Sequence, residues 1–107
     1  MKPMLMFQVY RPKAGHEEAL FELVKKHWPA VKRAGLATET LPLVYRAVDR
    51  HSKRPFFVEI FEWRDAEAPG VAHQMPEVMA IWEPMGPMIE GGPSPQIAAL
   101  EQVSVTA

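Results

Sequence analysis

The sequence predicts an α+β fold, a ferredoxin-like βαββαβ sandwich in which two helices cover one face of a four-stranded antiparallel sheet. Two observations predict it. Segments with strand patterns and segments with helix patterns follow one another in the order strand, helix, strand, strand, helix, strand. The chain has 107 residues and contains no linker-like tract, so we expect a single domain over residues 1–107.

The first half begins with a strand and an amphipathic helix. Residues 4–10 are apolar apart from Gln8, which predicts a strand covered on both faces. The next apolar positions recur with the spacing of one helix face: Leu20, Leu23, Val24, His27 and Val31. We expect Pro29 to kink or interrupt this helix, and Gly35 to end it in the left-handed conformation.

Two further strands, at residues 41–48 and 56–63, flank the polar loop 49–55 and predict an antiparallel hairpin. In the later strand, alternation places Glu59 on the same face as three aromatic residues: Phe57, Phe61 and Trp63. Asp65 is placed to cap a short helical segment, which Pro69 and Gly70 disturb.

Pro76 can begin the second helix as its first residue. One face of that helix carries Val78, Ile81, Trp82, Met85 and Met88. Residues 96–106 then predict a closing strand.

Helices on one side leave the other face of the sheet uncovered. We expect large side chains on that face: Met4, Met6, Tyr10, Phe57, Phe61 and Trp63. Exposed apolar patches of this size are typical of interfaces. The sequence therefore predicts a homodimer formed through the sheet face, a dimeric α+β barrel that encloses a cavity between sheet and helices.

Composition excludes several classes of function. The net charge is −1, with acids and bases interspersed, so we expect no nucleic-acid partner. There is no cysteine, which excludes disulfides, thiolate nucleophiles and cysteine-ligated metals. No apolar run reaches the ~20 residues of a membrane span. We expect a cytoplasmic protein with no membrane partner.

One segment resembles a known family. Within residues 57–65 the predicted strand ends at Trp63, and Asp65 follows it. Within residues 72–78 an Ala-His pair comes just before a short predicted helix. This arrangement resembles the antibiotic biosynthesis monooxygenase-like superfamily of dimeric α+β barrels. The resemblance implies a homodimer and either a cofactor-independent oxygenase or an isomerase acting on an aromatic or enolic molecule. The superfamily also includes haem-degrading oxygenases and many members without assigned activity.

The chain departs from the superfamily in one respect. It contains no asparagine, whereas the anthrone-type oxygenases and the haem-degrading branch place one near their substrate. Gln8 is the residue that could replace it.

His73 and Glu59 are the candidate catalytic residues. An imidazole at the mouth of a barrel can act as acid, base or metal ligand near neutral pH. Glu59 would take a proton from a phenolic or enolic ligand. The alternatives are structural: His73 would bond to a backbone carbonyl at a helix start, and Glu59 would pair across the hairpin with Arg46 or another cation.

The remaining candidates would bind substrate. Gln8, Tyr45 and Arg46 would hold an oxyanion. Trp63, Trp82 and Met85 would bound the pocket, although such a stripe also suits a plain core. No histidine has metal-ligand spacing with another, so we expect no metal site. The resemblance implies that the protein uses no cofactor. One alternative function is a non-catalytic barrel of stress-response type that binds either a small apolar molecule or, through His73, haem. The other is a dimer whose barrel is filled by its own side chains.

Overall fold

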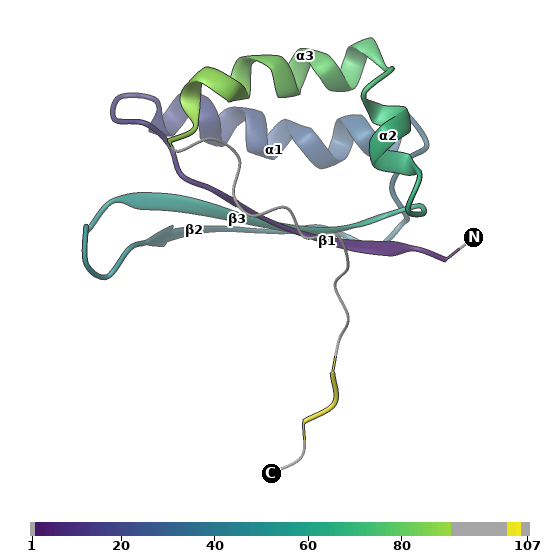
Figure 1. Cartoon of the computed structure of the whole chain (residues 1–107), viewed down its shortest axis with the longest axis horizontal. Coiled ribbons are helices and arrows are strands. Elements are labelled where there is room, and N and C mark those ends of the chain that lie inside the picture. Colours follow the sequence, from purple (N-terminus) through teal and green to yellow (C-terminus); the bar gives the residue numbers. More distant parts are fainter. Residues whose placement is uncertain (1, 91–102, 106–107) are drawn as a thin grey trace.

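In the computed structural model, which describes residues 2–90 and 103–105, the helices lie on one side of an antiparallel sheet (Figure 1). The elements in chain order are β1 Met4–Tyr10, α1 Glu17–Arg33, β2 Leu43–Val48, β3 Pro55–Trp63, α2 Ala68–Ala72, α3 Pro76–Met85 and a 3₁₀ turn, Gly86–Met88. The predicted order of strands and helices up to α3 is therefore confirmed.

The sheet has three strands in the part of the chain that the structure describes, not the four expected. Their order is β1-β3-β2, and both pairs are antiparallel. The predicted closing strand, 96–106, lies outside the described residues except for 103–105, which form neither helix nor strand.

Helix α1 ends as the sequence predicts. Gly35 has a φ of 79°, and its N–H donates to the carbonyl of Lys32 at 3.0 Å. The N–H of Leu36 reaches back to the carbonyl of Val31 at 2.9 Å, which completes a Schellman motif. Pro29 lies inside the helix without interrupting it.

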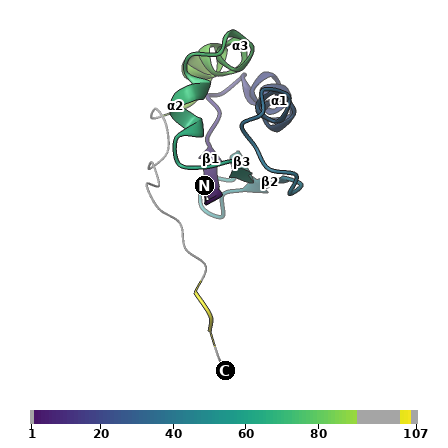
Figure 2. The ribbon, with the colours of Figure 1, turned by 90° about the vertical axis from the view of Figure 1, so that its right-hand side faces the viewer.

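The two long helices pack against each other above the sheet. Figure 2 shows α1 and α3 side by side, with α2 on the side of β1. Within residues 2–90, no helix combines the length and apolar character that crossing a membrane requires.

The strand register corrects the expected assignment of faces. Met4 lies opposite Trp63, Met6 opposite Phe61, and Tyr10 opposite Phe57. Residues opposite one another share a face, and all six belong to, or pack against, the core beneath the helices. The six residues expected on the uncovered face therefore form the covered one.

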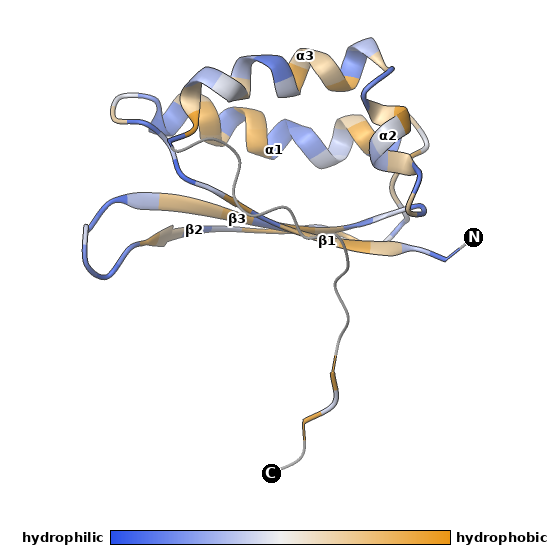
Figure 3. Cartoon of the chain, in the orientation of Figure 1, coloured by the Kyte–Doolittle hydropathy of each residue, from blue (hydrophilic) through white to orange (hydrophobic). Residues whose placement is uncertain are grey.

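The uncovered face is nevertheless mainly apolar. Figure 3 shows orange stretches along the strands, and the register shows which of these residues point away from the helices. The register assigns this outer sheet face to Leu5, Phe7, Val9, Leu43, Tyr45, Ala47, Phe56, Val58 and Ile60, together with one charged residue, Glu62. Leu43 and Tyr45 are more than half exposed there, at 52% and 53%. The premise that the sheet has two apolar sides is therefore correct, with the residues exchanged between them.

Replacing Gly35 with Ala tests the left-handed helix end. We expect a loss of about 1 kcal/mol in the free energy of unfolding, because an L-residue is strained at positive φ. Space is not the cause, since no atom lies within 4 Å of an added Cβ. Urea denaturation measures the loss.

The matched control is Gly70→Ala in α2, where a Cβ also has open space but no positive φ is required. We expect unchanged or higher stability there. Equal losses in the two variants would contradict the assignment.

Candidate functional site

A cavity of about 490 Å³ lies against β1, beneath α2 and α3. This volume is within the range of roughly 300–1,000 Å³ that is typical of small-molecule sites. Its lining is mainly aromatic and apolar, and seven of the described residues that line it are polar or aromatic: Phe7, Gln8, Tyr10, His27, Trp63, His73 and Trp82. Trp63 and Met85 complete the predicted wall.

A buried carboxylate lies behind this cavity. Strand β3 buries alternate side chains, and Glu59 is among them, with 0% exposure. Glu59 lies opposite Gln8 in the register, so Tyr10, two residues further along β1, is its diagonal neighbour on the same face. The sheet therefore brings a phenol next to a carboxylate.

Four side chains from four elements form one hydrogen-bonded chain, which we call the buried network: Tyr10, His27, Glu59 and Trp82. The Tyr10 hydroxyl donates to Glu59 Oε1 at 2.7 Å. His27 Nδ1 lies 2.8 Å from the same oxygen. The Trp82 indole N–H donates to His27 Nε2 at 2.7 Å. Glu59 Oε2 is buried and has no partner among the described residues.

The network changes the acidity of Tyr10. Burial raises the pKa of its hydroxyl well above 10.0, and the negative charge and hydrogen bond of Glu59 raise that pKa further. Tyr10 therefore stays protonated and remains a hydrogen-bond donor at physiological pH.

Helix α2 positions His73 at the rim of the cavity. Asp65 Oδ1 accepts hydrogen bonds from the backbone N–H groups of Glu67 and Ala68, both at 3.0 Å, which confirms its predicted capping role. His73 follows α2 as its C-terminal cap, is exposed, and packs edge-on against Trp82 with ring centroids 4.8 Å apart. Pro76 then begins α3, as predicted.

Two predicted binding residues lie away from the cavity. Tyr45 is on the outer sheet face. Arg46 lies on the helix side but is exposed, 4.5 Å from the centroid of Phe21 and 3.4 Å from a carboxylate oxygen of Glu18. The expected pairing of Arg46 with Glu59 is therefore wrong, because Tyr10 and His27 take that place.

His27 is the site residue that sequence reasoning underrated. It was expected only as one member of the apolar stripe of α1, yet it is 2% exposed and central to the buried network. The available signal was a polar residue on the buried face of a helix together with Glu59 on the buried face of a strand. Buried polar groups need partners, so two of them are candidates to meet.

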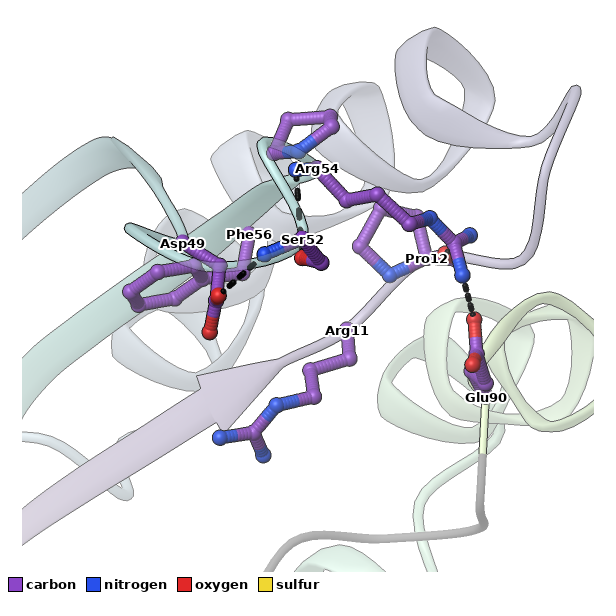
Figure 4. Close-up of a pocket in the computed structure, with 8 residues that line it drawn as sticks. Arg11, Pro12, Asp49, Ser52, Arg54, Phe56 and Glu90 are labelled. Atoms are coloured by element: carbon purple, nitrogen blue, oxygen red, sulfur yellow. Dashed lines mark hydrogen bonds and ion pairs between the residues drawn. The ribbon is translucent and has the colours of Figure 1, made fainter.

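A second pocket, of about 120 Å³, lies between the β2–β3 loop and the end of the 3₁₀ turn (Figure 4). Arg54 donates to the carbonyl of Pro12 at 2.9 Å and pairs with Glu90. Asp49 accepts two backbone N–H groups of its own loop. The charged groups Asp49, Arg54 and Glu90 of this second pocket thus form hydrogen bonds and an ion pair that stabilise the β2–β3 loop. The 490 Å³ cavity is therefore the better candidate site.

Among the described residues, no three His, Asp or Glu side chains gather into a group that could hold a metal ion.

The substitution Tyr10→Phe tests the buried network. We expect a loss of about 1.5–3 kcal/mol near neutral pH, the usual contribution of a hydrogen bond to a charged group. Because the pKa of Tyr10 is raised on folding, this contribution is complete below about pH 10 and is lost as pH rises through the folded-state pKa. Urea denaturation of both proteins across this range should show the difference shrinking at alkaline pH. A constant difference would contradict the assignment.

Comparisons with known proteins support the fold. No family model matches the chain, and no curated protein matches it. Rv0793 from Mycobacterium tuberculosis is similar in structure, with a TM-score of 0.63 and 12% identity over 96% of this chain and 100% of that one.

Two further solved structures are similar. A putative antibiotic biosynthesis monooxygenase from Chloroflexus aurantiacus J-10-fl has a TM-score of 0.63 and 15% identity, covering 99% of this chain and 96% of that one. A NIPSNAP family protein from Agrobacterium tumefaciens str. C58 has a TM-score of 0.56 and 15% identity, covering 83% and 78%. The chain therefore shares its α+β fold with these solved structures.

Proposed function

We propose that the chain is a small enzyme of the monooxygenase-like type, a cofactor-independent oxygenase or isomerase that deprotonates an aromatic or enolic molecule. The observation that carries this proposal is the 490 Å³ cavity, in which an exposed imidazole, His73, lies at an aromatic wall. The similarity to a putative antibiotic biosynthesis monooxygenase supports the same class of chemistry.

His73 is the proposed base. Its ring is exposed and lines the cavity, so a ligand can reach it, whereas Glu59 has no exposed surface and does not line the cavity. A planar ligand would lie against Trp63 and Trp82, with Met85 adapting to its outline. Glu59 would then act through the residues that it touches.

Gln8 is the proposed oxyanion donor. Its side-chain amide donates one N–H to the carbonyl of Val9 at 3.1 Å. An amide nitrogen carries two N–H groups, so a second remains for a ligand oxygen. When the ligand loses a proton to His73, the electron pair moves to its oxygen, where this N–H would stabilise the charge.

In the oxygenase form of the proposal, dioxygen is the oxidant. The carbanion would deliver an electron to dioxygen, and a CH₂ group would become a carbonyl, with the second oxygen atom leaving as water. In the isomerase form, His73 would return the proton to another carbon.

A homodimer is part of the proposal. The outer sheet face is apolar and exposed in one chain, and a second copy would cover it. Tyr45 would then serve the interface rather than the ligand.

Tyr45→Lys tests the dimer. We expect at least a tenfold rise in the Kd of dimerisation, because each copy would have to bury an added charge in an apolar interface. The control is Val48→Lys, on the same strand but the other face and 63% exposed. Light scattering during size exclusion across a dilution series measures both. A wild-type chain that is monomeric at all concentrations, or equal effects of the two variants, would contradict the dimer.

His73→Ala tests the catalytic role. A panel of planar phenols and 1,3-dicarbonyl enols is first screened for thermal stabilisation, and ligands that bind are then followed by dioxygen uptake and mass spectrometry. We expect turnover to fall about 10²–10⁴-fold in His73→Ala, the usual contribution of a general base, with binding retained. His51→Ala, in the exposed β2–β3 loop, is the matched control.

Two outcomes would contradict the proposal: no member of the panel stabilises the protein, or turnover is equal in His73→Ala. A haem titration distinguishes the non-catalytic alternative. A Soret band that disappears in His73→Ala, together with no turnover, would favour a haem-binding protein.

A further inference from the structure

We propose that His27, backed by the buried Glu59 carboxylate, is a second proton acceptor of this cavity and selects ligands that carry an acidic O–H group. The inference rests on the proposed function, because it concerns the same cavity. The proposed function gives roles to His73 and to the aromatic walls but none to His27.

The hydrogen bonds determine which ring nitrogen of His27 carries the proton. An indole N–H can only donate, so His27 Nε2, 2.7 Å from the Trp82 nitrogen, must accept and carry no proton. The remaining proton of the neutral ring is therefore on Nδ1, which donates to Glu59 Oε1 at 2.8 Å. His27 is thus a neutral base whose basic nitrogen is directed toward a cavity-lining side chain, Trp82.

The charge on Glu59 has no cation to balance it. Both of its partners, Tyr10 and His27, are neutral donors to Oε1, and Oε2 has no partner among the described residues. No lysine or arginine of residues 2–90 forms an ion pair with it. A buried charge is stabilised when an opposite charge forms beside it. A proton that arrives at His27 Nε2 would create that opposite charge.

Trp82 covers the basic nitrogen on the side of the cavity. It stands between two imidazoles, with its ring centroid 5.7 Å from that of His27 and 4.8 Å from that of His73. Its side chain is only partly buried and lines the cavity, whereas His27 is 2% exposed. In the proposal a ligand O–H takes the place of the indole N–H at Nε2, because that nitrogen has one lone pair and accepts one donor.

The proton transfer is balanced within the site. The ligand O–H bond breaks and an Nε2–H bond forms, and the electron pair stays on the ligand oxygen. The imidazolium keeps its Nδ1–H bond to Glu59, so the buried network changes from a lone negative charge to an ion pair. Ligands of similar shape that lack the acidic hydrogen would have no donor for Nε2.

The test uses 4-nitrophenol and its methyl ether 4-nitroanisole, because only the phenol has a proton to lose and its anion absorbs visible light. The protein carries His73→Ala, so that the rim imidazole takes no part, and the pH is chosen so that free 4-nitrophenol is neutral. We expect the bound phenol to show the nitrophenolate band and to bind at least tenfold more tightly than the ether.

Adding His27→Phe should remove both the band and the preference, whereas His51→Phe, as control, should change neither. If circular dichroism shows that His27→Phe is unfolded, Trp82→Phe replaces it. This variant keeps an aromatic ring but has no N–H to cover Nε2, so the nitrophenolate fraction should rise at least threefold.

Equal binding of the two probes without a nitrophenolate band would overturn the role of His27 and leave the cavity proposal intact. A nitrophenolate band that persists in His27→Phe would also overturn the role of His27. So would a nitrophenolate fraction that is unchanged in Trp82→Phe. Failure of both probes to bind would instead count against the proposed function, and this inference would fall with it.

Discussion

The buried Glu59 carboxylate determines how the strands and helices around it are arranged. The group has no exposed surface, so its charge must be met from inside the protein. Strand β1 provides Tyr10 and helix α1 provides His27, and His27 in turn accepts the indole N–H from α3. One carboxylate therefore ties four elements together, and a shift of any one of them would leave a buried polar group unpaired.

The same constraint links the fold to the cavity. Tyr10, His27 and Trp82 are both members of the buried network and part of the cavity lining. The aromatic wall on which a planar ligand would lie is thus held by hydrogen bonds as well as by packing. On the opposite side of the sheet the outer sheet face is mainly apolar, and its one carboxylate among the strand residues, Glu62, accepts hydrogen bonds from the hydroxyls of Thr38 and Thr40. The sheet therefore has one face specialised for a site and another suited to an interface.

Much of this could be predicted from local patterns. The helical stripe of α1, the alternation in β3, the left-handed Gly35, the Asp65 cap and the start of α3 at Pro76 all depend on neighbours in sequence. What failed depends on register and on long-range pairing. Alternation shows which β3 residues share a face but not which face the helices cover, and it cannot show that Glu59 meets His27, 32 positions away, rather than Arg46. Periodicity likewise placed Tyr45 and Arg46 on strands without placing them relative to the cavity.

The proposed role of His27 requires Glu59 to be an ionised carboxylate held by neutral donors, and infrared spectroscopy can detect the state of this side chain. The difference spectrum between the wild type and Glu59→Gln at neutral pH isolates the vibrations of this one side chain. We expect the stretching bands of a carboxylate, shifted by the hydrogen bonds to one of its oxygens. The carbonyl band of a protonated acid in their place would contradict the proposed role of His27, because a neutral Glu59 would have no charge with which to stabilise a protonated His27.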